Sequence, residues 1–213
     1  MTEQNKANWE TRNFHDFWAE IAPKDHLVQV YESEQVFLNT LEGFVASGLT
    51  TGDTVIVIAS QDHVMAIDAR LRLQPIDVDG LVQAGKYFPL DARDMLEKFV
   101  IAGWPDEKLF FETVSSLFAK ARKSGSKIRA FGEMVAILWE QGNYAATVHL
   151  EHLWNKFCAR QAFCLFCAYP QSGFTQDAGE SVAHICHAHS KMIAGVSQSQ
   201  TEVFYKTVEK QVG

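Results

Sequence analysis

The side chains best placed to do chemistry in this sequence follow apolar, strand-like runs, at the points where those runs end. In an open α/β sheet, ligands bind outside the carboxyl ends of the strands. We therefore expect the polar residues at three such ends, and one tryptophan from the helix after the third, to border a ligand cleft. They are Tyr31, Glu32 and Ser33 after the first run, Ser60, Gln61 and His63 after the second, and Glu133 and Trp139 after the third.

Glu133 is the most informative of these residues, because a carboxylate directly after an apolar strand can act as a base or bind a polar ligand. The same side chain can instead accept hydrogen bonds from the free amides at the start of the following helix. The sequence leaves both interpretations open. Trp104, Trp139 and Trp154 could line an apolar pocket, although filling the core is the commoner role of such residues.

A second group of reactive side chains crowds into the segment AHICHAHS, which contains His184, Cys186, His187 and His189. At 100° per residue, His184 and His187 share one face of a helix. Cys186 and His189 share the opposite face. One zinc ion needs three or four ligands and cannot take all four from an intact helix. His149 and His152 could add another pair only if the fold brought two helices together. We therefore predict surface or capping histidines here, and no metal site.

Cys164 and Cys167 form a CxxC pattern inside the β-like segment FCLFCAY. Residues three apart on a strand point to opposite faces, about 10 Å apart, which is beyond the reach of a disulfide. A redox CxxC begins a helix instead. These cysteines are therefore interpreted as buried and reduced.

The elements that must position these residues alternate between strands and helices. Apolar or β-branched runs predict strands over residues 27–31, 54–59, 128–132 and 163–168. Helical stretches are predicted before, between and after them, over residues 9–21, 62–73, 91–101, 134–159, 178–192 and 198–211. This alternation predicts a three-layer α/β/α domain with a mainly parallel sheet. Its central strands are expected over residues 54–59, 128–132 and 163–168, because their continuous apolar character requires helices on both faces.

Composition excludes several classes of function. The 213 residues are 47% hydrophobic and 21% charged, which is typical of one globular domain. A formal net charge of -7 provides no basic field for nucleic-acid phosphates, so we expect no direct nucleic-acid binding. No apolar run approaches the roughly 20 residues that span a bilayer, and the polar N-terminus lacks a secretory signal. These features predict a cytoplasmic protein without membrane contact.

The first strand–turn–helix unit, VQVYESEQVFLNTLEGF, is laid out like a phosphate-binding unit but lacks its residues. A phosphate loop needs the pattern GxxxxGK[ST], whereas this turn carries Glu32 and Glu34 and neither glycine nor lysine. Without converging amides, and with acidic side chains nearby, the turn would repel a triphosphate. We therefore expect neither tight ATP binding nor ATP hydrolysis.

Several phrases resemble the methanogen/methylotroph DcmR-type sensory (MEDS) domain family, namely HLVQVYESEQVFLNTLEGF, RAFGEMVAILWEQGN, LEHLWN, CAYP and ICHAHS. The resemblance covers residues 26–190. It implies a RecA/KaiC-like fold that lacks the phosphate loop, and a sensory role in which a small molecule biases an attached output module. In some members this molecule is suspected to be a hydrocarbon derivative. Residues 1–25 would form an N-terminal helical extension and residues 191–213 a C-terminal helical tail.

The resemblance implies a sensory role, but this sequence departs from the usual arrangement of the family, and we expect a stand-alone module. Family members commonly carry an output segment, for which the residues after ICHAHS leave no room, so we expect a separate partner such as a histidine kinase or transcription regulator. In this interpretation, Glu133 and His63 fix the polar end of the ligand. Two alternatives stay open: an enzyme that uses the same cleft for acid/base or nucleotide chemistry, and a ligand-free interaction subunit. The sequence leaves the cofactor unknown and does not decide whether the chain forms a homodimer.

Overall fold

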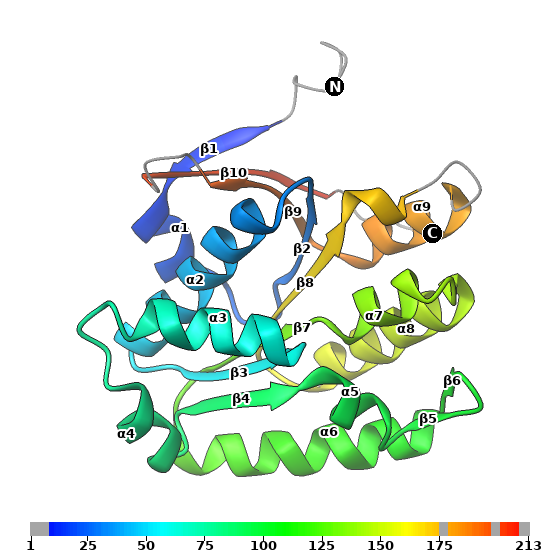
Figure 1. Ribbon diagram of the computed structural model, residues 1–213, viewed down its shortest axis with the longest axis horizontal. Coiled ribbons are helices and arrows are strands. Elements are labelled where there is room, and N and C mark those ends of the chain that lie inside the picture. Colours follow the sequence, from blue (N-terminus) through cyan, green and yellow to red (C-terminus); the bar gives the residue numbers. More distant parts are fainter. Residues whose placement is uncertain (1–8, 175–178, 197–200, 209–213) are drawn as a thin grey trace.

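The computed structural model describes residues 9–174, 179–196 and 201–208, which contain one eight-stranded sheet (Figure 1). Its strands are β1 Glu10–Asn13, β2 His26–Tyr31, β3 Thr54–Ala59, β4 Tyr87–Asp91, β7 Ile128–Gly132, β8 Cys164–Pro170, β9 Lys191–Val196 and β10 Glu202–Thr207. They lie in the order β1-β10-β9-β2-β8-β7-β3-β4. The strands from β9 to β4 are parallel, whereas β10 pairs antiparallel with both β9 and β1. Two short strands, β5 Val100–Ile101 and β6 Trp104–Pro105, pair separately.

Helices cover both faces of the sheet and bury a separate apolar core on each (Figure 1). One face carries α1 Phe14–Ala19, α2 Glu34–Thr50, α3 Gln61–Leu71 and α4 Val78–Gln83. The other face carries α5 Ala92–Leu96, α6 Glu107–Ala121, α7 Met134–Glu140, α8 Tyr144–Arg160 and α9 Gly179–Ala188. The predicted three-layer α/β/α architecture with a mainly parallel sheet is confirmed.

The three strands expected at the centre of the sheet do lie there. Every residue of β3 and β7 is buried, as are all residues of β8 except its last. Each of these strands pairs on both sides, so helices must cover both of their faces. Along β8, Cys164 belongs to the core on one face and Cys167 to the core on the other, as their spacing predicts.

The predicted N-terminal helix is shorter than expected. A helix over residues 9–21 was expected, but the structure has strand β1 over Glu10–Asn13 and helix α1 only over Phe14–Ala19. Asn13 explains the boundary, because its side chain accepts hydrogen bonds from the backbone N–H groups of His15 and Asp16 and caps the helix. The residues before this cap pair with β10, which lies far away in the sequence.

The prediction of a helical C-terminal tail is wrong for the described residues. Helix α9 ends at Ala188, and residues 191–196 form β9, which pairs with β2. The helix expected over residues 198–211 is replaced by β10, while residues 178, 198–200 and 209–211 lie outside the described part. The segment EVFYKT has a strand-like alternation, with Val203 fully buried, and its antiparallel neighbours supply the hydrogen bonds that make it a strand.

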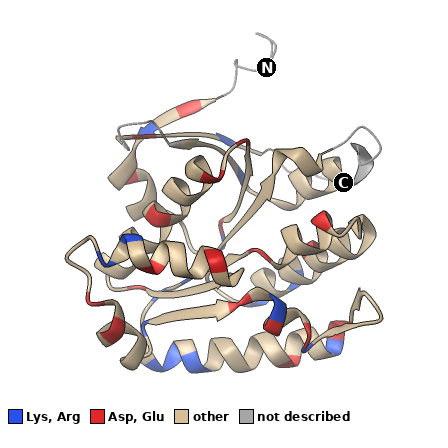
Figure 2. Ribbon diagram, viewed as in Figure 1, with Lys and Arg blue, Asp and Glu red and all other residues tan. Residues whose placement is uncertain are grey.

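Acidic and basic residues both occur on α3 and α6, whereas α1, α2 and α7 carry acidic residues only (Figure 2). Among the described residues, no helix combines the length and the apolar character that crossing a membrane requires.

Candidate functional site

The structure brings three of the predicted site residues together at the carboxyl ends of β3 and β7. The Glu133 carboxylate, directly after β7, accepts a hydrogen bond from the Ser60 backbone N–H at 2.7 Å. Its other oxygen lies 2.8 Å from Nδ1 of His63. Glu133 makes no side-chain capping bond to its own helix α7, so its carboxylate joins β7 to the start of α3. We call Ser60, His63 and Glu133 the strand-end cluster.

His63 lies between two carboxylates, because its Nε2 is 3.7 Å from Glu34. Burial lowers the pKa of His63, but the hydrogen bond and charge of Glu133, with the charge of Glu34, outweigh it and raise the pKa above its ordinary value. Tyr31 stacks on Phe37, whose ring meets the edge of His63. Burial, followed by the charge of Glu133, raises the pKa of Tyr31. The cluster is therefore a hydrogen-bonded junction in which the imidazole of His63 lies between two carboxylates, beside an aromatic wall.

The remaining predicted site residues lie outside this hydrogen-bonded junction. Glu32, Ser33 and Gln61 are exposed, and the Ser33 hydroxyl caps α2. Trp139 is 1% exposed, and its indole N–H donates to the Gly173 carbonyl at 2.8 Å. Trp139 therefore fills the core and ties α7 to the segment after β8. Among the other tryptophans, Trp154 is fully buried, while the ring of Trp104 stacks on His149.

A second polar cluster lies inside the core, where four elements meet. It consists of His26 at the start of β2, Glu151 on α8, Cys167 on β8 and His189 after α9. Their nitrogen, oxygen and sulfur atoms all lie within 4.8 Å of one another. None of these side chains is more than 4% exposed. We call these four residues the buried cluster.

Hydrogen bonds orient both imidazoles of the buried cluster. Nδ1 of His26 lies 3.0 Å from the Asn155 amide oxygen, and Nδ1 of His189 lies 2.6 Å from the Ile185 carbonyl oxygen. An oxygen acceptor of this kind requires that Nδ1 carry the proton, which leaves Nε2 as the acceptor atom. Both Nε2 atoms lie 3.6 Å from the Glu151 carboxylate.

Burial disfavours the charged forms of the ionisable groups in this cluster. It raises the pKa of Glu151 to about 8, against the opposing effect of the hydrogen bond from the Tyr169 hydroxyl. Burial also lowers the pKa of His189, and His26 lowers it further. The pKa of the Cys167 thiol is raised by burial and then by the charge of Glu151. Four ionisable side chains thus meet at a position where burial disfavours their charged forms.

The prediction for AHICHAHS was correct for two of its histidines but missed His189. His184 and His187 are exposed, whereas His189 is fully buried and belongs to the buried cluster. The spacing within AHICHAHS does not indicate the partners of His189, because they come from β2, α8 and β8. One sequence signal was available. Glu151 follows Leu150 and precedes Leu153 and Trp154, so it interrupts the apolar face of a helix.

A cavity of about 540 Å³ lies between α8 and α9, and His26 and Glu151 form part of its wall. Other polar residues in the wall are His152, Asn155, His184 and His187. Apolar groups complete it, among them Val148, Ala159 and Ile185. The cavity therefore connects the buried cluster with the protein surface near two exposed histidines of α9.

Fold and topology define this chain as a KaiC-like α/β domain. A crystal structure of a KaiC-like protein from the hyperthermophilic archaeon Pyrococcus horikoshii OT3 superimposes with a TM-score of 0.55 at 10% sequence identity. The match covers 81% of this chain and 72% of that protein. At this identity the likeness concerns the fold alone.

The chain belongs to the MEDS family, the methanogen/methylotroph, DcmR sensory domain, whose family model matches residues 25–190. The expected family is therefore confirmed. A comparison with curated proteins finds no match. Membership of a sensory-domain family indicates a sensory or regulatory role.

Proposed function

We propose that this chain is a sensory module that binds a small organic molecule in the cavity between α8 and α9. The observation that carries this proposal is the cavity itself. Its volume of about 540 Å³ is within the range of about 300–1,000 Å³ that is usual for small-molecule sites. Its wall combines apolar side chains with a few polar groups, which is the composition expected for a ligand with a hydrocarbon part and one polar end.

The cavity also offers a route for a signal. Helix α9 forms one of its walls and leads directly into β9, which belongs to the main sheet. If α9 can adopt two placements, a ligand that binds more tightly to one of the two conformations shifts the population of the protein toward it. The signal then passes to a separate partner protein, such as a histidine kinase or a transcription regulator, that contacts the C-terminal strands.

Filling the cavity tests this site. Ala159 is exposed on α8 and lines the cavity, so Ala159→Trp places an indole at its entrance without displacing core residues. Ala145→Trp is the matched control, because Ala145 is exposed on the same helix and does not line this cavity. The probes are short alcohols, amides and halogenated hydrocarbons, screened by their effect on the melting temperature. A ligand at 100 times its Kd stabilises the fold by about 2.7 kcal/mol.

We expect the stabilising probes to lose their effect in Ala159→Trp and to keep it in Ala145→Trp. If every probe leaves the melting temperature of the original chain unchanged, ligand sensing of this chemistry is refuted. If the effect survives in Ala159→Trp, the ligand binds elsewhere.

The strand-end cluster is the second candidate site for the ligand, because His63 lies between the carboxylates of Glu133 and Glu34. The aromatic ring of Tyr31 adds an apolar wall beside it. In this alternative, Glu133 and His63 hold the polar end of the ligand. Glu133→Gln and His63→Ala would then abolish the ligand-induced rise in melting temperature, whereas Ala159→Trp would leave it intact. The same two residues could act as an acid/base pair, for which turnover of a probe is the test.

A further inference from the structure

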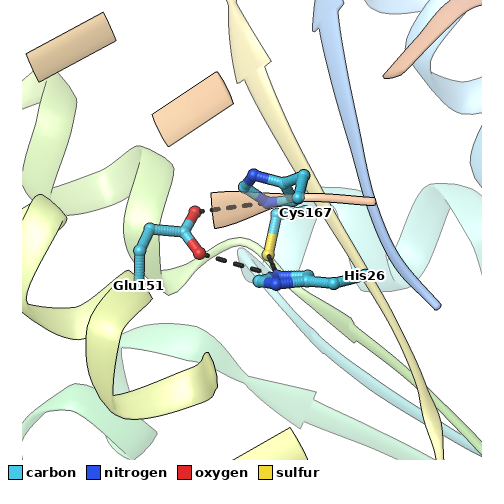
Figure 3. A group of neighbouring side chains, drawn as sticks. His26, Glu151 and Cys167 are labelled. Carbon is cyan, nitrogen blue, oxygen red and sulfur yellow. Dashed lines mark hydrogen bonds and ion pairs between the residues drawn. The ribbon is translucent and has the colours of Figure 1, made fainter. Parts of the chain in front are cut away.

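We infer that the buried cluster is a metal site, in which His26, Glu151, Cys167 and His189 bind one divalent ion of the zinc class. The ligand atoms are Nε2 of both histidines, the thiolate of Cys167 and a carboxylate oxygen of Glu151. Figure 3 shows the side chains of His26, Glu151 and Cys167 turned toward one another from three different elements. The proposed metal site borders the cavity proposed above for ligand sensing, because His26 and Glu151 line that cavity, but metal binding needs no organic molecule and is tested separately.

The distances within the cluster fit a four-coordinate ion. Bonds from zinc to nitrogen, oxygen and sulfur of about 2.0–2.3 Å place tetrahedral ligand atoms roughly 3.3–3.8 Å apart. The Cys167 sulfur lies 3.5 Å from Nε2 of His26. Oε2 of Glu151 lies 3.6 Å from Nε2 of His26, and Oε1 of Glu151 lies 3.6 Å from Nε2 of His189. With Oε2 of Glu151 as the ligand atom, two of these separations already match a tetrahedral site, and all four ligand atoms lie within 4.8 Å of one another.

The surroundings of both histidines are those of metal ligands. A metal-bound imidazole usually donates its other N–H to a carbonyl or carboxylate, which fixes its tautomer and orientation. Asn155 accepts from His26 in this way, and the Ile185 carbonyl accepts from His189. The Tyr169 hydroxyl donates to Glu151 and holds the carboxylate in place.

Two polar atoms of the cluster lack the hydrogen bond that their burial requires. Oε2 of Glu151 and Nε2 of His189 have no hydrogen-bond partner among the described residues. Both side chains are at least nine-tenths buried, and buried polar atoms of native proteins normally have a partner. A metal ion among the four residues supplies that partner to both atoms at once.

The ligand set also selects the kind of ion. One thiolate and two imidazoles favour zinc, cobalt(II) or iron(II) over Mg²⁺ and Ca²⁺, which prefer oxygen ligands. Binding releases the thiol proton of Cys167 and the carboxyl proton of Glu151 to solvent. The two negative ligands then balance the two positive charges of the ion, so the filled site is neutral. A neutral site suits a core that excludes water.

Cobalt(II) is the first probe, because its spectrum reports both geometry and ligand type. The full chain is stripped with a chelator and titrated with Co²⁺, then with Zn²⁺. We expect one Co²⁺ per chain, the strong visible bands of four-coordinate cobalt and a thiolate-to-cobalt charge-transfer band in the near ultraviolet. Zn²⁺ should displace the cobalt and raise the melting temperature. If the original chain shows no charge-transfer band, or binds Co²⁺ only at several weak sites, the metal site is refuted.

Matched variants identify the ligands. Cys167→Ser should remove the charge-transfer band, while Cys186→Ser should keep it, because Cys186 lies outside the buried cluster. His189→Ala should lose stoichiometric metal, while His149→Ala should retain it. Asn155→Ala leaves all four ligands in place and should weaken zinc binding roughly 10–100-fold.

Asn155→Ala is expected to fold even if the ligand variants do not, because Asn155 is only partly buried and its side chain is not part of the apolar core. If Cys167→Ser or His189→Ala does not fold, the metal site is tested by the cobalt spectrum of the original chain and by the zinc affinity of Asn155→Ala. Unchanged zinc affinity in Asn155→Ala, or an unchanged charge-transfer band in folded Cys167→Ser, would overturn the assignment. A failure of ligand sensing is a separate result, since it is measured by the organic probes and the Ala159→Trp variant.

Discussion

Replacing Glu133 with glutamine should destabilise the protein more in mild acid than in mild alkali. The Glu133 carboxylate accepts from the Ser60 N–H at 2.7 Å and lies 2.8 Å from Nδ1 of His63. Glutamine keeps a carbonyl oxygen for the Ser60 N–H but removes the negative charge opposite His63. One charge-assisted hydrogen bond is therefore lost, which corresponds to about 1.5–3 kcal/mol.

The pH dependence follows from the pKa of His63, which is raised above its ordinary value in the folded protein. A raised pKa means that the folded state holds the proton more tightly than the unfolded state. The stabilisation is fully present below the unfolded pKa of about 6.5, and it disappears as the pH rises through the folded pKa. Above that pKa, Glu133→Gln should cost less, because the imidazole is then neutral and the charge–charge attraction is already absent.

Urea unfolding at about pH 6 and about pH 9 measures both costs, and NMR titration of the imidazole gives the pKa of His63 directly. His63→Ala and the double variant complete a thermodynamic cycle, which isolates the interaction between the two side chains. Comparison with the original chain at each pH removes the contributions of all other titrating groups. An equal cost at both pH values, or a larger cost at pH 9, would refute the ionic interaction of His63 with Glu133.

Three further predictions concern stability and nucleotide binding. Asp53→Ala should lose about 3–5 kcal/mol in urea unfolding, because it leaves the buried Arg129 guanidinium without its carboxylate at 2.6 Å. Asp79→Ala, which breaks an exposed ion pair, should lose much less than Asp53→Ala, and equal losses would contradict this ranking. Gly43→Ala should lower the melting temperature by an amount equivalent to about 1–3 kcal/mol, because its Cβ would lie 2.3 Å from the Phe14 ring. Calorimetry with ATP and Mg²⁺ should detect no micromolar binding, and a micromolar Kd would contradict our interpretation of the acidic turn after β2.

The sequence predicted secondary structure best in segments whose hydrophobic pattern is compatible with only one kind of element. TVIVIA is apolar or β-branched at nearly every position, and only a strand covered on both faces buries all of these side chains. The strand-end rule likewise indicated that Ser60, His63 and Glu133 would meet, because parallel neighbouring strands end at the same edge. Which hydrogen bonds they form was not predictable, since a helix-capping role for Glu133 was equally consistent with the sequence.

Segments whose structure depends on a distant partner were predicted less well. EVFYKT becomes a strand because β9 and β1 provide its hydrogen bonds, and β1 lies at the other end of the chain. Local preference is weak for such a short segment, and the sequence alone predicts a helix there. The same dependence shortened the N-terminal helix, where pairing with β10 holds the residues before Asn13 in a strand.

The sequence by itself determined the alternation of strands and helices, the buried central strands and the family to which the chain belongs. Each of these depends on residues that are neighbours along the chain. Only the tertiary structure placed His26, Glu151, Cys167 and His189 within 4.8 Å of one another. His26 is separated from the other three by more than half of the chain, and all four belong to different segments, so no local spacing links them. Contact between them arises only because β2 and β8 are adjacent in the sheet while α8 and α9 pack over the same face.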